Sequence, residues 1–213
     1  MALGKSNLLI DNDESGIETL AVAGSSAMAL WTQVVQEMRQ EYLDGTHNFP
    51  WIIGFSGGKD STLVVHAAVE ALTSLPPSRR RRAIHVVSND TLVESPVVIA
   101  HLDTVTSAIR LMAIDLDLPI TVARTTPEIT KSFWVLLIGK GYPSPNQTMR
   151  WCTDRLKIQP TSEYIKKYVS EAGAAVVVLG VRRDESETRQ NSINRHKNLR
   201  DTNLSPPSAS RYN

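Results

Sequence analysis

The chain has 213 residues, of which 41% are hydrophobic and 21% charged, a balance typical of one globular domain with a full core. A formal net charge of +1 provides no strong overall attraction toward nucleic acid or a membrane. We find no apolar run near the roughly 18 residues that span a bilayer, and the polar, acidic N-terminus lacks the layout of a signal peptide. One cysteine excludes a disulfide within the chain. We therefore expect a cytoplasmic protein with no membrane partner.

A flexible lead-in and a helix are predicted before the first core strand. Residues 1–24 are polar and lack sustained periodicity, which predicts a flexible lead-in. A helix is predicted over 27–43, where Leu30, Val34 and Met38 share one face and Gly45 follows the end.

The stretch from Trp51 to Leu72 combines a buried strand, a glycine-rich loop and an amphipathic helix. The loop consists of Ser56, Gly57, Gly58, Lys59, Asp60 and Ser61. Paired glycines let the backbone turn sharply and approach a ligand, while the N–H groups of a helix start attract an anion. Lys59 adds a positive charge, and the two serine hydroxyls suit phosphate oxygens, although Ser61 could instead cap the helix. The stretch therefore predicts a phosphate cradle.

The spacing of this loop differs from a Walker A loop, which requires G-x-x-x-x-G-K followed by Ser or Thr. Here Asp60 follows Lys59, and Ile53 occupies the position of the first glycine. The cradle therefore belongs to another class of phosphate-binding loop.

Two charged segments follow the predicted helix. Arg79–Arg82 could bind nucleic-acid phosphate or an acidic partner, or could be a solvated loop, and the run is too short to decide. A buried strand is predicted over 83–88. Asp90 and Glu94 come after it, and the carboxyl end of a strand is where an open α/β sheet binds ligands, so Mg²⁺ or ribose binding competes here with simple turn and cap chemistry.

Predicted helices and strands continue to alternate in the second half of the chain. A helix is predicted over 96–115, a strand over 119–123 and a helix over 129–139, in which Phe133 and Trp134 are expected in the core rather than in a stacking platform. The segment 150–160 then groups cations around Cys152. A helix over 161–172 and a strand over 174–181 follow. This alternation predicts an α/β fold with a parallel, doubly wound sheet and helices on both faces.

Three motifs carry a resemblance to a known superfamily. SGGKDS at Ser56–Ser61 resembles the PP-loop of ATP pyrophosphatases, while WCTDRLKIQP at Trp151–Pro160 and GVRRDESETR at Gly180–Arg189 look like signatures of the phosphoadenylylsulfate reductase branch. Together with SNDTLVESP at Ser88–Pro96, they are most similar to the ATP pyrophosphatase component of DNA phosphorothioation systems of the Dnd or Ssp type. The resemblance implies a Rossmann-like domain over 25–189, with 190–213 as a polar segment that is truncated, disordered or docked on a partner.

The resemblance also implies an activity. ATP would be cleaved to AMP and pyrophosphate to activate the DNA backbone for sulfur insertion, with sulfur supplied by a cysteine desulfurase. The implied catalytic residues are Lys59, Asp60, Cys152, Arg183 and Arg189. The implied nucleotide-binding residues are Ser56, Gly57, Gly58, Lys59, Asp60, Ser61, Ser88, Asp90, Gly180 and Arg182.

The implied metals are Mg²⁺, at Asp60 and Asp90, and an iron–sulfur cluster with Cys152 as a ligand. One cysteine cannot complete a cluster within one copy of this chain. Other phosphorothioation components are expected partners, and a homo-oligomer is compatible with the sequence. Two alternatives stay open: a reductase of adenylylated sulfate, which needs a second thiol, and an ATP-binding scaffold for a desulfurase without turnover.

Overall fold

The computed structural model describes residues 14–146, 148–172 and 174–180. In this part of the chain, four parallel strands form one sheet in the order β3-β2-β1-β4. They are β1 (Trp51–Gly54), β2 (Ile84–Asn89), β3 (Ile120–Thr125) and β4 (Val176–Val178). In the register of the sheet, Trp51 lies opposite Ile84 on one side and Val176 on the other. The predicted parallel α/β architecture is confirmed.

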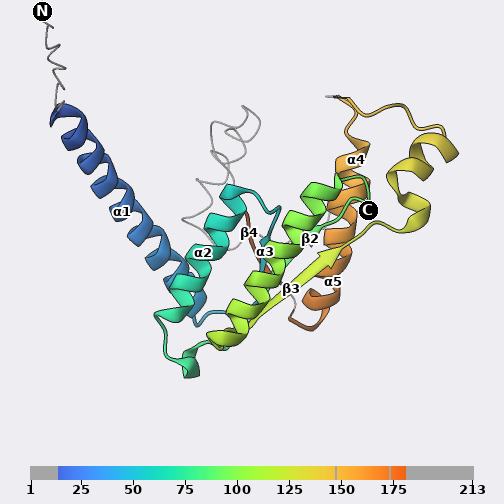
Figure 1. Ribbon diagram of the computed structural model, residues 1–213. Helices are drawn as coiled ribbons and strands as arrows, with labels where there is room; N and C mark the ends of the chain where they lie inside the picture. The colour runs from blue at the N-terminus through green and yellow to red at the C-terminus, as the bar shows by residue number, and fades with distance from the viewer. Residues whose placement is uncertain (1–13, 147, 173, 181–213) are drawn as a thin grey trace, which may run out of the picture.

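The helices lie on both faces of this sheet. They are α1 (Glu14–Leu43), α2 (Lys59–Thr73), α3 (Pro96–Asp115), α4 (Trp151–Thr153) and α5 (Gln159–Ala172). The chain moves outward from β1 to β3 and then returns to place β4 on the other side of β1. Right-handed crossovers therefore place α2 and α3 on one face and α5 on the other, with α1 beside α2 (Figure 1).

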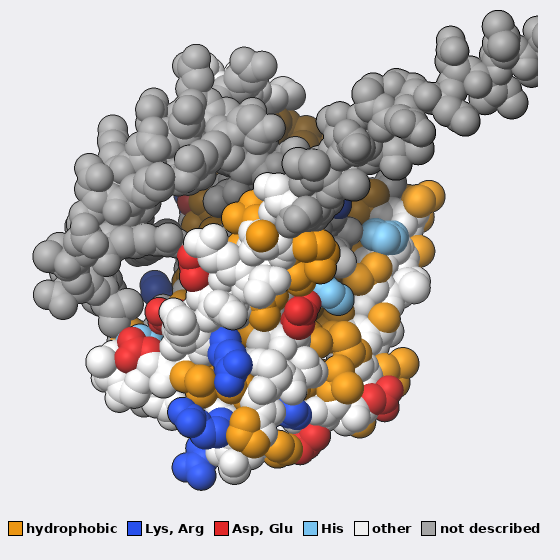
Figure 2. Space-filling model, turned by 90° about the vertical axis from the view of Figure 1, so that its left-hand side faces the viewer, with side chains coloured by type: hydrophobic (Ala, Val, Ile, Leu, Met, Phe, Trp, Pro, Cys, Tyr) orange, Lys and Arg blue, Asp and Glu red, His pale blue; other side chains and the backbone are white. Residues whose placement is uncertain are grey.

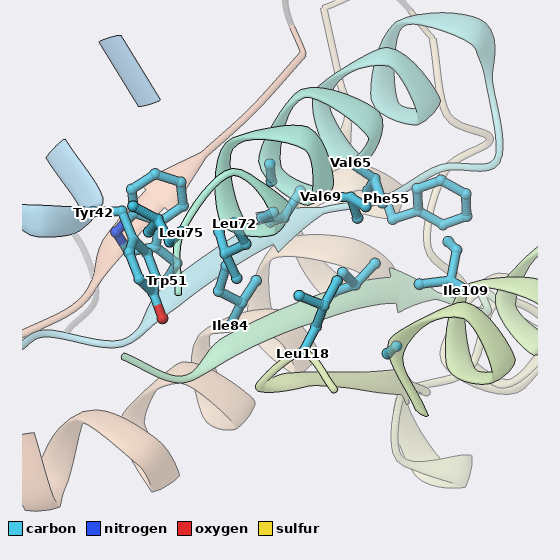
Figure 3. Close-up of a cluster of buried hydrophobic side chains, with 14 of the residues drawn as sticks. Tyr42, Trp51, Phe55, Val65, Val69, Leu72, Leu75, Ile84, Ile109 and Leu118 are labelled. Carbon is cyan, nitrogen blue, oxygen red and sulfur yellow. The ribbon is translucent and has the colours of Figure 1, made fainter. Parts of the chain in front are cut away.

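The core forms between the sheet and the α2–α3 layer. The central strands β1 and β2 are almost continuously apolar because helices cover both of their faces. Ile53, Ile84 and Leu72 are completely buried, and Ile109 of α3 packs in the same cluster (Figure 3). This core fixes the loop between β1 and α2 at the carboxyl edge of the sheet.

Helix α1 is longer than predicted, because it begins at Glu14 rather than at 27. Gly24 and the serines after it have low helix propensity, so the sequence did not predict that the helix extends through them. Its later turns pack on α2, where Val35 contacts a small cluster with Ala67 and Ala71. Residues 14–24, predicted as part of a flexible lead-in, are therefore helical.

The arginine run 79–82 contributes to the fold. Arg82 is 4% exposed and donates to the carbonyl oxygens of Glu41, Asp44 and His47 at 2.7–2.9 Å, which satisfies carbonyls around the end of α1. Arg80 also donates to main-chain carbonyls of neighbouring segments. In Figure 2, the blue side chains gather in the lower part of the face shown. The loop between β1 and α2 lies instead at the upper end of α2 in Figure 1, which shares the same vertical axis. For these two arginines, the structure supports neither a nucleic-acid patch nor a solvated loop.

The helix predicted over 129–139 is wrong in detail. The segment instead forms a 3₁₀ turn, η2 (Ile129–Lys131), and a π-helical turn, η3 (Val135–Gly139). Ser132 between them is extended, with ψ 157°, and interrupts the helical hydrogen bonds. Two further short elements are the 3₁₀ turn η1 (Pro77–Arg79) and the π-helical turn η4 (Asp154–Ile158). Trp134 is 57% exposed, so its predicted place in the core is also wrong.

Helix α3 corrects the sequence reading on one further point. Among the described residues it is long and apolar enough, by length and composition, to cross a membrane. The sequence reading missed it because Asp103 and Arg110 interrupt the apolar run. In this fold, Leu102, Ile109 and Ala113 of α3 are buried, and the helix covers β2 and β3.

Candidate functional site

The candidate site lies where the strand order reverses, between the carboxyl ends of β1 and β4. The glycine loop follows β1, and Gly180 follows β4. A Cβ atom added to Gly180 would lie 2.8 Å from the carbonyl oxygen of Asp60, so the chain after β4 packs directly on the first turn of α2. The fold thus brings Gly180, the first residue of the third motif, against the first motif at the reversal point, where open α/β sheets bind ligands.

The loop backbone is shaped to receive an anion. Gly57 has φ +75°, a conformation that side chains strongly disfavour. Gly58 is the N-cap of α2 and is extended, and no side chain caps the helix. The first turn therefore places backbone N–H groups at the positive end of the helix dipole, an arrangement that suits an anion.

Hydroxyl groups brace the loop from within. The Ser61 hydroxyl is buried, donates to the Gly58 carbonyl at 2.9 Å and accepts the Ser56 N–H at 3.3 Å. The Thr62 hydroxyl also donates to the Gly58 carbonyl, at 2.9 Å. Ser61 therefore holds the turn rather than capping the helix, whereas Ser56 and Lys59 are exposed at the loop surface.

His101 of α3 supports the loop from its other side. Its Nε2 lies 3.1 Å from the Gly57 carbonyl oxygen and donates to it in the Nε2-protonated tautomer. A hollow of about 480 Å³ lies here between α2 and α3, and its lining includes Lys59, His66 and His101. Sequence reasoning missed His101, because its partner lies 44 residues away in the chain.

The carboxyl end of β2 is tied to α5 by Asn89, which sequence reasoning also missed. Its amide donates to the hydroxyls of Thr125 and Thr161 at 2.7 and 2.6 Å, and to the Lys157 carbonyl at 3.3 Å. Ser88, predicted to bind the nucleotide, is 1% exposed and its hydroxyl bonds within the sheet. The hydroxyl of Ser88 is therefore engaged within the sheet.

A second link joins the same two elements. His85 of β2 has its Nδ1 3.0 Å from the hydroxyl of Tyr164 on α5. Burial lowers the pKa of His85, which favours the neutral imidazole at neutral pH. This pair fixes α5 on the sheet face opposite α2.

The two predicted carboxylates beyond β2 shape a tight turn. Asp90 is partly exposed and accepts the N–H of Leu92 at 2.9 Å, where Leu92 has φ +62°. Glu94 accepts the Thr91 hydroxyl at 3.0 Å and lies 3.9 Å from the Lys157 ammonium. Asp90 and Glu94 therefore accept hydrogen bonds within the turn and also lie near the edge of the candidate site.

Cys152 lies in α4 and is partly exposed, with a free thiol. The preceding Trp151 stacks on Phe133, with ring centroids 5.3 Å apart. Of the expected cations around the thiol, Arg150 is exposed and Arg155 lies 3.8 Å from the Asp154 carboxylate. Segment 150–160, which contains Cys152, is held at the carboxyl end of β2, because Asn89 donates to the carbonyl oxygen of Lys157.

The predicted arginines Arg182, Arg183 and Arg189 lie outside the described residues. The described part of the predicted site is therefore the loop, Ser88, Asp90, Cys152 and Gly180.

Comparisons with known proteins agree with this arrangement. A family model described as the phosphoadenosine phosphosulfate reductase domain matches residues 50–201. An uncharacterized protein of Methanocaldococcus jannaschii is 30% identical over 143 residues, which are 67% of this chain and 28% of that protein. The chain thus spans less than a third of the length of this relative. The family match begins immediately before β1 and includes the loop, Cys152 and Gly180.

Proposed function

Because this chain belongs to the phosphoadenosine phosphosulfate reductase domain family, a family of enzymes that act on nucleotides, we propose that it is an ATP pyrophosphatase. In this proposal it cleaves ATP to AMP and pyrophosphate and thereby activates the DNA backbone for sulfur insertion. The observation that supports it best is the loop Ser56–Ser61, whose backbone turn at Gly57 and uncapped helix start suit the terminal phosphates of ATP. The choice of ATP and DNA rests on the resemblance of the sequence motifs.

The proposed chemistry follows from leaving-group ability. A non-bridging oxygen of the DNA phosphate attacks the α-phosphorus of ATP, and pyrophosphate leaves. In the proposed reaction, Lys59 and the N–H groups of α2 stabilise the negative charge on the departing pyrophosphate. The oxygen on the DNA now belongs to AMP, which is a far better leaving group than oxide, and a sulfur nucleophile displaces it.

Mg²⁺ suits the carboxylates of this site. Asp60 in the first turn of α2 and Asp90 after β2 supply the hard oxygen ligands that Mg²⁺ prefers. Bound Mg²⁺ would neutralise phosphate charge. An iron–sulfur cluster does not fit the thiol content, because Cys152 is the one cysteine in the chain, and we derive no step from such a cluster.

We infer that a cysteine desulfurase docks near Cys152 and transfers sulfur to it as a persulfide, because the half-exposed thiol is the one sulfur nucleophile in the sequence. The outer sulfur of the persulfide attacks the DNA phosphorus and displaces AMP, and a thiol reductant then cleaves the S–S bond, which leaves sulfur on the DNA and restores the Cys152 thiol. Cys152→Ser keeps the size of the side chain and removes the thiol. It is expected to abolish sulfur incorporation into DNA while ATP affinity stays within about twofold of wild type, because the thiol is not part of the phosphate loop.

The measurement follows ³⁵S from labelled cysteine into duplex DNA, with desulfurase, Mg²⁺, ATP and a thiol reductant present. Met149→Leu is the matched control, because it removes a neighbouring exposed sulfur that is not a thiol, and it should incorporate label normally. Full incorporation by Cys152→Ser would exclude Cys152 from sulfur transfer.

A second candidate is supported by the description of the matching family model, which names phosphoadenosine phosphosulfate reductase. That reaction reduces an adenylylated sulfate and needs thiols, of which this chain carries one. Sulfite release from phosphoadenosine phosphosulfate and a thiol donor would favour this second candidate over the pyrophosphatase.

A further inference from the structure

Residues 129–158, here named the aromatic lobe, carry four aromatic rings in contact. Phe133 stands edge-on to Trp134 with ring centroids 5.1 Å apart, and it stacks on Trp151 at 5.3 Å. Tyr142 contacts Trp151 edge-on at 5.4 Å. Trp134 ends this chain of rings and is 57% exposed, so it presents an aromatic ring to solvent, whereas the other three rings are partly buried.

The aromatic lobe is also the basic part of a nearly neutral protein. It contains five Lys and Arg residues and one Asp, a net charge of +4, whereas the whole chain has +1. Three of its cations lie within 4 Å of a carboxylate, namely Lys131, Arg155 and Lys157. Lys140 and Arg150 are exposed, and no carboxylate of the described residues lies that close to either. Two cations are thus free to meet an anion.

The aromatic lobe stands at the carboxyl edge of the sheet, above α5 in Figure 1. Asn89 at the end of β2 bonds to the Lys157 carbonyl and anchors the base of the lobe there. Trp151, which belongs to the ring cluster, directly precedes Cys152. A molecule bound on these rings would therefore lie beside the thiol.

We propose that the aromatic lobe binds a single-stranded or locally opened stretch of nucleic acid. An exposed Trp134 offers its face for stacking with an unpaired base, and Lys140 and Arg150 bind the adjoining phosphates. Net positive charge beside an exposed ring favours a polyanion with aromatic bases over an apolar protein surface. Only the placing of this nucleic acid as the sulfur acceptor beside Cys152 rests on the proposed function.

The test measures fluorescence anisotropy of a labelled single-stranded oligothymidine with the full chain and without ATP. Two phosphate contacts predict that the logarithm of affinity falls with the logarithm of salt concentration with a slope of about −1.4. Trp134→Leu should weaken binding about 10-fold, whereas Trp134→Phe should keep most of it, because a ring still stacks on the base. Arg150→Gln should reduce the salt slope by about 0.7. Urea denaturation checks that each variant is folded.

Two exposed residues outside the aromatic lobe provide matched controls. Arg39→Gln on α1 removes a charge, and Leu111→Ala on α3 removes apolar surface, and both should bind as wild type. Wild-type affinity in Trp134→Leu, or an equal loss in Arg39→Gln and Arg150→Gln, would overturn the proposal. So would a duplex that binds as tightly as the single strand without dependence on Trp134. If the wild-type chain cleaves ATP but does not bind the oligonucleotide, this inference alone is contradicted. If it binds the oligonucleotide but does not cleave ATP, the proposed function alone is contradicted.

Discussion

Lys59 is the residue on which the proposed chemistry depends most. It is the first residue of α2, it is exposed, and it follows two glycines whose backbone leaves space above the helix start. Its charge therefore adds to that of the helix dipole at one point. Ser61, in contrast, is buried and maintains the turn.

Lys59→Ala should lower the rate of pyrophosphate release by about 10²-fold or more, because the departing charge loses a fixed cation. The measurement is a coupled pyrophosphate assay at saturating ATP. Lys166→Ala, which removes an exposed lysine of α5, is the matched control and should be unchanged. Near-normal pyrophosphate release by Lys59→Ala would show that the loop does not take part in the reaction.

At the residue scale, the sequence predicted the sharp turn before α2, because the paired glycines and the helix start are neighbours in the chain. The role of the six loop residues in binding phosphate stays a prediction. Asn89 and His101 were missed because Asn89 bonds to a residue 72 positions away and His101 to one 44 positions away. Trp134 was assigned to the core because hydrophobicity does not tell whether a neighbouring element covers a side chain.

At the scale of elements, the loop between β1 and α2 depends on one residue with positive φ. Gly57 has φ +75°, and a Cβ there would lie 3.3 Å from Leu102 of α3. Gly141 has φ +67° with nothing within 4 Å of its Cβ position. The two glycines therefore share a backbone conformation that would be strained in a residue with a Cβ, but they differ in their surroundings.

Gly57→Ala and Gly141→Ala should each reduce the free energy of unfolding by about 1–2 kcal/mol, the cost of a left-handed residue with a Cβ. Gly57→Ala alone should also raise KM for ATP, because the phosphate loop changes shape. Urea denaturation and steady-state kinetics measure the two effects separately. An equal rise of KM in both variants would show that lost stability, not loop geometry, is responsible.

Element prediction succeeded for segments with a clear apolar pattern or a proline at the boundary, and it failed for those that depend on distant packing. Strands β1 and β2 and helix α3 were predicted within one or two residues, because their apolar runs and prolines mark them. The π-helical turns η3 and η4 were not predicted. Their wider hydrogen bonds, such as Lys140 N–H to the Val135 carbonyl, lack a hydrophobic period of their own.

For the whole molecule, the decisive feature is the return of the chain to β4 beside β1. This return packs Gly180 on the Asp60 carbonyl, although the two residues are far apart in the sequence. The parallel sheet could be predicted from alternating elements, but the strand order could not, because it is set by tertiary packing. The contact between the first and third motifs therefore became visible only in the fold.

Gly180→Ala should disturb the site through this contact. The added methyl group would lie 2.8 Å from main-chain oxygen, so α2 or β4 must move, at a cost of about 1–3 kcal/mol in stability, with weaker ATP binding. Calorimetric titration with a non-hydrolysable ATP analogue measures the affinity. Gly45→Ala is the control, because nothing lies within 4 Å of its Cβ position. Unchanged affinity in Gly180→Ala would separate β4 from the nucleotide site.

The proposed activity depends most directly on which phosphate bond of ATP is cleaved. The chain is incubated with ATP and Mg²⁺, with and without duplex DNA, and the products are identified by ³¹P NMR. We predict one AMP, free or joined to the DNA, for each pyrophosphate released, and a rate of release about 10²-fold lower in Lys59→Ala. ADP and inorganic phosphate would contradict the α–β cleavage, and ATP binding without turnover in both conditions would contradict the enzyme itself.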